Sequence, residues 1–373
     1  MKIPIIGASI SGLYTAIGLA RQGLGCTVFD RRGKNFEKRT LIVTPEVLNF
    51  IKIPDEIILN RIFRFELYSK RARTTIELEK PDIVFERSAF EGYLERLATS
   101  EGVEILRERE LQGIFNDGKE WVIELKSVGS DRKDHLRINR IIGADGVCSK
   151  VAGSLGLSHK KVNLVQARVK LPKGHKRDTT RVWFDKRFTD YFIWLIPDSK
   201  DTGVCGLCLE GKDAKERLDA FIKELDLEVL EYEAGFAACY LPSFYPEISV
   251  DGMKAYLVGD AGLQVKMSTV GGVFAGLWGA YAVSKSLAKG IPFKTLYKDL
   301  KRELDVHFYI RKTLSSMDES DYDRLIQKVS VNLKDVLYSM PRDKARSLVF
   351  KMLIKEPYVL WLGAKGVLKN LGG

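Results

Sequence analysis

A glycine-punctuated turn near the start of the chain constrains the fold more than any other stretch. Residues 6–12 read IGASISG, in which Gly7 and Gly12 hold the outer positions of a G-x-G-x-x-G pattern and Ser9 replaces the central glycine. In that pattern the first glycine permits a tight turn, the second lets the backbone approach a pyrophosphate, and the third lets a helix pack close to a strand. The hexamer alone fits a dinucleotide-binding turn and an ordinary strand-to-helix turn equally well.

The flanking residues favour the dinucleotide-binding interpretation. An apolar strand precedes the turn at residues 3–6, and apolar residues at helical spacing follow it as far as Gly23 or Gly25. A second strand then ends at Asp30, about twenty residues beyond the glycines, where a carboxylate can accept hydrogen bonds from an adenosine ribose. A plain surface carboxylate is the alternative. Pro4 is unexpected in a central strand, because it has no amide hydrogen to donate.

Length and composition bound the class of protein. The 373 residues exceed one core and predict two closely packed domains. Hydrophobic residues make up 45% and charged residues 29%, as in ordinary globular proteins. No apolar run approaches the roughly eighteen residues of a membrane span, and no secretion signal opens the chain. Five cysteines, an odd number, fit a reducing compartment better than a disulfide framework, so we expect a cytoplasmic protein.

The net charge of +11 is spread along the chain. It therefore argues against a nucleic-acid-binding block and favours anionic headgroups, phosphorylated substrates or an acidic electron carrier as partners. A solvated lysine-rich surface is the alternative. Abundant Lys, Arg and Glu with scarce Gln and His lean towards a thermophile. The four histidines show no metal-ligand spacing, so we expect no metal site.

Two later segments also contain an apolar strand that ends in a glycine next to an aspartate. RINRIIGADG brings an apolar strand to Asp145-Gly146, and AYLVGDAG brings another to Gly259-Asp260 before a glycine-rich helix. Between them, VQARVKL, TTRVWFD, DYFIWLIP and TGVCGLCLEG predict antiparallel strands, and AKERLDAFIKEL predicts a helix. We expect an α/β (α+β) fold with a Rossmann-like domain in three sequence segments, an inserted antiparallel β-sheet domain and a helical C-terminal region. The predicted bounds are 1–70, 85–160 and 247–290 for the first, 71–84 and 161–246 for the second, and 291–373 for the third.

Three local patterns carry further expectations. Ser88 is predicted to cap a helix, with Glu91 as its capping-box partner. Asn116-Asp117-Gly118 predicts a hairpin turn. Cys205 and Cys208 have the spacing of a redox motif, but residues three apart on a strand face opposite sides, so we do not expect them to act together.

The three segments resemble the FAD-dependent reductases and monooxygenases of the para-hydroxybenzoate hydroxylase fold, over roughly residues 1–290. Within that superfamily they look most like the geranylgeranyl reductases. That family's third motif reads approximately GDAAGFVNPLTGGGI, and this chain offers GDAGLQVKMSTVGGV at residues 259–273. FIWLIP, preceded by Tyr191, is similar to the family's Tyr-x-Trp-x-Phe-Pro stretch at Trp194 and Pro197. Met267 in place of proline and Val270 in place of a glycine depart from the family pattern.

The resemblance implies non-covalent FAD. Its pyrophosphate would lie at the start of the first helix, its adenosine ribose at Asp30, and its ribityl chain at Asp260. Amide groups at Gly271 and Gly272 would stabilise negative charge at the N1/C2-carbonyl edge of reduced flavin. The predicted cofactor-binding set is Gly7, Ser9, Ile10, Ser11, Gly12, Asp30, Arg31, Arg87, Asp145, Gly146, Gly259, Asp260, Gly271, Gly272 and Val273. The predicted catalytic set is Gly271, Gly272, Tyr191 and Trp194.

The resemblance further implies a reductase of isoprenoid (geranylgeranyl) double bonds in a lipid or lipid precursor of the kind found in archaeal membranes. Aromatic residues would wall its apolar pocket, with plain core packing as the alternative; the candidates are Trp183, Tyr191, Trp194 and Tyr240. The alternative functions are an FAD-dependent monooxygenase of an aromatic or quinone, a flavin halogenase-like enzyme, and a non-enzymatic electron carrier or lipid-binding relative. The expected electron donor is NAD(P)H or a ferredoxin, a small electron-transfer protein.

The C-terminal tail predicts peripheral contact with the inner face of a membrane, with packing over the second domain as the alternative. Its apolar and interfacial residues are Tyr358, Leu360, Trp361, Leu362, Val367 and Leu368, and its interspersed lysines are Lys355, Lys365 and Lys369.

Overall fold

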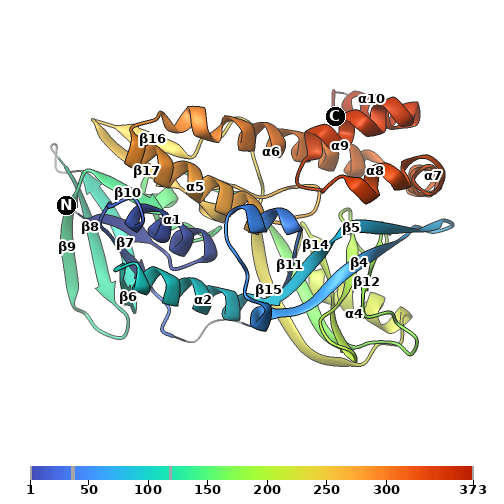
Figure 1. Ribbon diagram of the computed structural model, residues 1–373, viewed down its shortest axis with the longest axis horizontal. Helices are drawn as coiled ribbons and strands as arrows, with labels where there is room; N and C mark the ends of the chain where they lie inside the picture. Colours follow the sequence, from blue (N-terminus) through green and yellow to red (C-terminus); the bar gives the residue numbers. More distant parts are fainter. Residues whose placement is uncertain (1, 35–37, 117–119, 372–373) are drawn as a thin grey trace.

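The computed structural model describes residues 2–34, 38–116 and 120–371, with the side chains of residues 366–371 left aside. Two sheets lie at opposite ends of the molecule, and the C-terminal helices run along one side of both (Figure 1). The predicted turn at Asn116-Asp117-Gly118 lies partly outside the described residues, although the strands that flank it pair as a hairpin from Asn116 to Trp121. The mixed α/β class, with a Rossmann-like sheet, an additional sheet and C-terminal helices, is confirmed.

The first sheet has six strands within the described residues and is parallel except at β16. In spatial order its strands are β16 (Glu247–Val250), β17 (Met253–Leu257), β10 (Arg140–Gly143), β1 (Ile3–Ile6), β2 (Cys26–Asp30) and β6 (Glu104–Arg107). The carboxyl ends of β10, β1 and β2 therefore lie side by side at one edge. In sheets of this kind, ligands bind at that edge.

Pro4 lies in the central strand β1 without breaking its pairing. The amides of Ile3 and Gly7 both donate to the β2 side, to Gly25 O and Phe29 O. Since backbone directions alternate along a strand, the Pro4 nitrogen points towards β10, where the pairing begins only at Ile5. The missing donor thus falls beyond the end of the β10 ladder.

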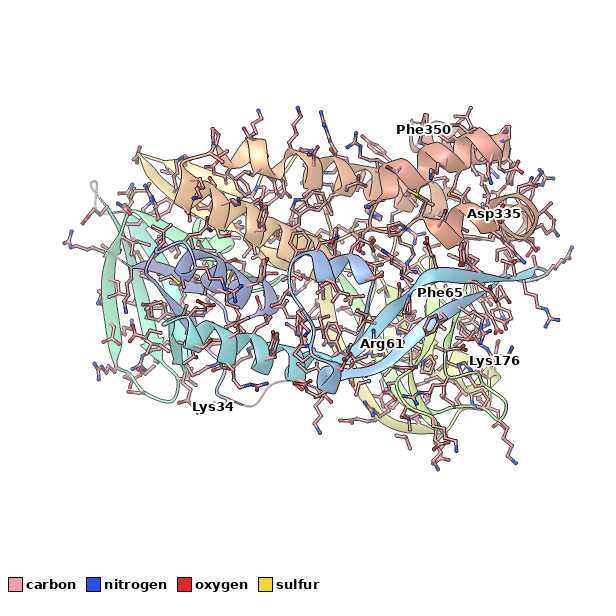
Figure 2. The ribbon with its side chains drawn as sticks, in the orientation of Figure 1. Lys34, Arg61, Phe65, Lys176, Asp335 and Phe350 are labelled. Carbon is pink, nitrogen blue, oxygen red and sulfur yellow. The ribbon has the colours of Figure 1, made fainter. Side chains whose placement is uncertain are left out.

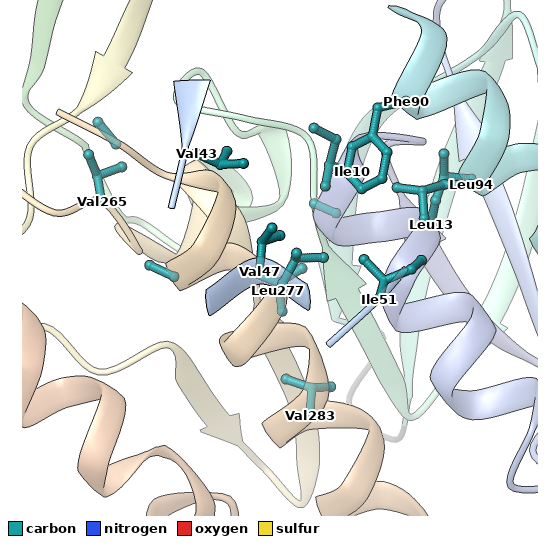
Figure 3. Close-up of a cluster of buried hydrophobic side chains, with 14 of the residues drawn as sticks. Ile10, Leu13, Val43, Val47, Ile51, Phe90, Leu94, Val265, Leu277 and Val283 are labelled. Atoms are coloured by element: carbon teal, nitrogen blue, oxygen red, sulfur yellow. The ribbon is translucent and has the colours of Figure 1, made fainter. Parts of the chain in front are cut away.

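Different layers cover the two faces of this sheet. Helices α1 (Ile10–Ala20), α2 (Arg87–Ser100) and α5 (Val273–Lys289) pack on one face, where Leu13, Phe90 and Leu94 meet in the core shown in Figure 3. A three-stranded sheet of β7 (Arg109–Asn116), β8 (Trp121–Ser127) and β9 (Lys133–Ile138) supplies the apolar cover of the other face. Helices α1 and α5 approach closely because Gly276 faces Ser11, where an added Cβ would lie 2.3 Å from Ser11 Oγ.

The second sheet has eight strands within the described residues. In spatial order they are β15 (Val229–Ala238), β11 (Lys161–Lys170), β14 (Thr202–Leu209), β13 (Ile193–Pro197), β12 (Thr179–Trp183), β4 (Ile58–Tyr68), β5 (Arg73–Glu86) and β3 (Thr40–Val43). The predicted strands and the helix α4 (Ala214–Glu224) are present. The pairing is antiparallel except between β12 and β4. Strands β3 and β4 lie in this sheet, although the predicted bounds placed residues 1–70 with the cofactor-binding segments.

The predicted capping box at Ser88 is wrong. Helix α2 already begins at Arg87, with Glu86 at the N-cap, and Ser88 donates its hydroxyl to the Glu86 carboxylate. Glu91 is 1% exposed and accepts hydrogen bonds from Arg87 and Arg32 instead of capping the helix. A buried carboxylate between two guanidinium groups is better stabilised than one bonded to a single backbone amide.

The other helices of the described residues lie mostly in the C-terminal region. They comprise α3 (Lys150–Ser154), α6 (Phe293–Ser316), α7 (Glu319–Lys328), α8 (Lys334–Ser339), α9 (Ala345–Lys355) and α10 (Pro357–Leu371), with short single-turn segments at Pro45–Asn49, Asp55–Ile57, Gly259–Gly262 and Val329–Leu333. No helix in the described part of the chain has the length and apolarity needed to cross a bilayer.

Candidate functional site

The turn after β1 has the geometry that the sequence pattern predicts. Gly7 adopts φ = 103°, and a Cβ added there would lie 2.4 Å from Ala144 O. Ser9 is the N-cap of α1: its hydroxyl accepts from the Gly12 amide (3.3 Å) and donates to Ala144 O (3.0 Å). The serine in place of the central glycine therefore ties the turn to the end of β10, while the first amides of α1 remain available for an anion.

Asp30 lies at the end of β2 beside this turn and is 4% exposed. It accepts hydrogen bonds from the Ala8 amide (2.6 Å), the Arg32 amide (2.7 Å) and two nitrogens of the Arg32 guanidinium (both 3.1 Å). Burial alone would raise the pKa of Asp30, but the hydrogen bonds and charge of Arg32 hold the pKa below its usual value. Because these four bonds occupy the carboxylate's lone pairs, a ribose hydroxyl that donated to Asp30 would have to displace one of them.

A cavity of about 220 Å³ opens at this edge of the sheet. Gly7, Ser9, Asp30, Asp145 and Gly146, which were predicted to belong to one nucleotide site, line this cavity together. Its basic side chains are Arg31, Arg32, Arg87, Arg109 and Lys150. A wall of this composition suits an anionic diphosphate.

Asp145 has a local structural task within the same cavity. Its carboxylate accepts hydrogen bonds from Ser149 Oγ (2.6 Å), the Lys150 amide (2.7 Å) and the Val151 amide (3.1 Å). Burial raises the pKa of Asp145 despite these bonds. The residue therefore fixes the start of α3, while Gly146, which has φ = 81°, also lines the cavity.

Asp260 lies beside the start of α5. The predicted helix start is confirmed: Gly272 is the N-cap and Val273 the first helical residue. A Cβ on Gly272 would lie 3.1 Å from Asp260 Oδ1, and Asp260 Oδ2 accepts from the Ala238 amide (3.2 Å). Burial raises the pKa of Asp260, and the charge of Arg87 counteracts it in part. The start of α5 thus brings together five of the predicted cofactor-binding residues, namely Gly259, Asp260, Gly271, Gly272 and Val273.

A second cavity, of about 330 Å³, lies between this helix start and one face of the eight-stranded sheet. Its sheet wall is mostly apolar and comes from Phe65 (labelled in Figure 2), Leu67, Leu164, Val182, Trp194 and Ile196. Gly206 makes room for the Trp194 indole, since an added Cβ would lie 2.6 Å from the ring. Gly271, Gly272, Val273 and Phe274 form the opposite wall. We call this space the reaction cavity.

Two buried hydrogen-bond donors of the sheet belong to residues that line the reaction cavity. Trp194 is 8% exposed and Thr180 is 1% exposed, and both line the cavity. Neither Trp194 Nε1 nor Thr180 Oγ1 has a hydrogen-bond partner among the described residues. Because an unpaired buried donor is costly, these groups favour a bound molecule that carries an acceptor.

The other predicted aromatic residues lie elsewhere. Tyr191 and Tyr240 line a separate cavity of about 1110 Å³ that faces α6. Tyr191 donates to Glu210 (3.2 Å), and Tyr240 donates to Asp305 (2.6 Å). Trp183 packs against Tyr68 and Phe221. Tyr191 and Trp194 therefore line different cavities, because residues three apart along an extended segment face opposite sides.

The two cysteines of the CGLC stretch lie on opposite faces of the sheet, as predicted. Cys208 lines the reaction cavity, whereas Cys205 packs in the core that α4 covers. Burial raises the pKa of the Cys208 thiol to about 12. A thiol of this kind is not a nucleophile near neutral pH.

Several polar residues that sequence reasoning missed also lie at these sites. Lys266 and Ser268 line the reaction cavity from the loop before α5, with Asp343 and His307 behind them. Ser268 Oγ lies 2.6 Å from His307 Nδ1, and burial together with the charge of Lys266 lowers the pKa of His307 to about 3. These partners come from distant segments, so spacing along the chain gave no signal. Arg32, in contrast, directly follows the predicted Asp30 and Arg31.

The residues present fit FAD. The Gly7 turn leaves a cradle that a side chain would fill, the first cavity is basic, and small residues border the start of α5. Together with the family match that follows, these features support an oxidoreductase of the flavoprotein type. The chain belongs to the FAD-binding domain family, whose model matches residues 1–221. No curated protein matches this sequence.

Solved structures share the fold at low identity. A geranylgeranyl bacteriochlorophyll reductase-like protein from Thermoplasma acidophilum aligns with a TM-score of 0.79 at 16% identity, covering 96% of this chain and 97% of that one. A p-nitrophenol 4-monooxygenase from Pseudomonas putida gives 0.70 at 16% identity, covering 95% and 98%. A flavin-dependent brominase gives 0.68 at 16% identity, covering 96% and 98%.

Proposed function

We propose that the protein is an FAD-dependent reductase that saturates isoprenoid double bonds of a lipid or lipid precursor. The reaction cavity carries this proposal, because an apolar chain would lie between the sheet and the start of α5. Full-length similarity in fold to a geranylgeranyl reductase-like protein supports it. FAD, when bound, would supply the hydride.

The chain's own residues would position the alkene and supply the proton. Phe65, Leu67 and Val182 exclude water from the cavity, which favours a fixed orientation of the substrate and restrains side reactions. Ser268 Oγ lies 2.6 Å from His307 Nδ1, and the low pKa of His307 keeps the imidazole neutral. In the tautomer with its proton at Nδ1, the ring donates to Ser268 Oγ, and the serine hydroxyl can direct its own proton into the cavity. The start of α5 presents free amides towards developing negative charge.

The test is a single-turnover reaction without oxygen. The holoenzyme is reduced chemically, mixed with a geranylgeranyl phosphate or a geranylgeranyl ether lipid, and the products are weighed by mass spectrometry. We expect a gain of two hydrogens per reduced double bond. Unchanged masses for both lipids would refute the proposal. NAD(P)H and a ferredoxin are then compared as donors; the net charge of +11 supports an acidic protein donor.

An aromatic or quinone monooxygenase is the second candidate, and one observation favours it. The unpaired Trp194 Nε1 and Thr180 Oγ1 suit a substrate with an oxygen acceptor, which a bare hydrocarbon segment lacks. Oxygen-dependent hydroxylation of a phenol or quinone, together with no alkene reduction, would establish this function instead.

We further propose that α9 and α10 contact a lipid surface. Phe350 (labelled in Figure 2) and Ile354 of α9 are 66% and 68% exposed, and Leu360 and Trp361 of α10 are 63% and 47% exposed. Leu362, predicted as part of this surface, is buried against Met317 and Tyr322 instead. Val367, Leu368 and Lys369 lie outside the described side chains.

Replacing both Phe350 and Trp361 by serine is expected to weaken vesicle binding at least about tenfold, because each aromatic side chain contributes more than 1 kcal/mol of apolar transfer. The measurement is sedimentation with anionic phospholipid vesicles. A Phe115→Ser variant, which alters an exposed aromatic residue on β7, is the control. Equal sedimentation of the native protein, the double variant and Phe115→Ser would show that α9 and α10 do not contact the vesicle surface.

A further inference from the structure

Lys266 is a buried cation at the start of α5. Its backbone amide donates to Gly271 O (3.0 Å), so the root of the side chain is fixed next to the helix start. A Cβ placed on Gly271 would lie 3.4 Å from Lys266 Cε and 3.7 Å from Lys266 Nζ. The side chain lines the reaction cavity and is 10% exposed. Its ammonium group thus lies beside the amides that the site offers to a negative charge.

Asp343 holds this ammonium group from the C-terminal region. It lies in the turn between α8 and α9, is 1% exposed, and accepts hydrogen bonds from Lys266 Nζ and Thr44 Oγ1. Burial alone would raise the pKa of Asp343, but the charge and hydrogen bond of Lys266 hold the pKa below its usual value. The neighbouring Arg342 bonds Asp82 of β5, which fixes the same turn to the second sheet. The ion pair is therefore oriented, with its positive end towards the cavity.

We propose that Lys266 is a second source of positive potential at the flavin site and that Asp343 moderates it. Reduced flavin gains negative charge, which the helix start alone would stabilise only with partial charges. A full charge in a buried setting acts more strongly than in water. The C-terminal region would thereby help to set how readily bound FAD is reduced. This inference rests on FAD binding and is independent of the substrate.

The test compares charge variants by redox equilibration with a reference dye at pH 7. In Lys266→Met we expect the equilibrium constant to shift on the order of tenfold towards oxidised flavin. In Asp343→Asn we expect a shift in the opposite direction, because the ammonium group loses its counter-charge. Lys266→Arg should remain near the native value, since it keeps the charge. The control is Lys312→Met, which removes an exposed lysine at the separate cavity lined by Tyr191 and Tyr240.

Two results would overturn the proposal. One is an equilibrium in Lys266→Met equal to that of Lys312→Met while FAD content and melting temperature fall, which is the signature of a purely structural ion pair. The other is a shift of Asp343→Asn in the same direction as Lys266→Met. Because no substrate enters the measurement, failure of the lipid-reduction assay would leave this test unaffected.

Discussion

Replacing Gly7 by alanine is expected to give a folded protein that retains far less FAD. The new Cβ would lie 2.4 Å from Ala144 O, and φ = 103° is unfavourable for any residue with a side chain. The turn must therefore move away from β10 and lose the Ser9–Ala144 hydrogen bond. With strain on the order of 2–3 kcal/mol, we expect FAD affinity to fall about a hundredfold.

Gly23→Ala is the matched control for this variant. Gly23 also has a positive φ, 77°, but an added Cβ there meets nothing within 4 Å. It therefore imposes backbone strain without the collision at the nucleotide turn. The measurements are flavin absorbance per protein after purification and fluorescence titration of the apoprotein with FAD. Equal FAD retention by the two variants would show that the Gly7 turn does not hold the cofactor.

The cofactor edge was predictable because its signals are local. A turn, a strand end and a helix start each need only a few neighbouring residues, so the turn at Gly7, the strand end at Asp30 and the helix start at Gly272 were predicted from the chain alone. Parallel strands then bring such segments to one edge. What the pattern could not reveal is that Arg32 occupies the Asp30 carboxylate, because this depends on the conformation of the segment after β2.

The reaction cavity was predicted less completely, for two physical reasons. The interpretation of FIWLIP assigned Tyr191 and Trp194 to one site, but residues three apart in an extended segment face opposite sides, and of these two only Trp194 lines the reaction cavity. The ion pair between Lys266 and Asp343 joins residues 77 positions apart. It forms only when the C-terminal helices dock beside the sheet, and local sequence carries no sign of that docking. Local sequence likewise did not show that β3 and β4 pair within the eight-stranded sheet instead of lying with the predicted nucleotide-binding segments.

Replacing Asp260 by asparagine is expected to weaken FAD binding and to stabilise the apoprotein. Asp260 is the half-buried carboxylate at the α5 start, and its predicted partner is a hydroxyl of the ribityl chain. Loss of a charge-assisted hydrogen bond of about 1.5–3 kcal/mol corresponds to a tenfold to hundredfold lower affinity. Among the described residues of the apoprotein, the carboxylate accepts from one backbone donor, the Ala238 amide, so its partial burial is poorly compensated.

The pH dependence of stability gives this prediction its sign. Burial raises the pKa of Asp260 in the folded apoprotein above the usual 3.8 of the unfolded chain. At pH values between the unfolded-state and folded-state pKa, the folded apoprotein therefore binds more protons than the unfolded chain. The stability that Asp260 contributes is present below pH 3.8 and is lost as the pH rises through its folded-state pKa. In urea unfolding of the apoproteins, the free energy of unfolding of Asp260→Asn, relative to the native chain, should therefore increase from acid to neutral pH. The control is Asp131→Asn, at a fully exposed carboxylate, whose free energy of unfolding should follow that of the native chain. A gain in stability that does not change with pH would refute the assignment of a poorly compensated buried charge. FAD affinity equal to that of the native protein would remove Asp260 from the ribityl site.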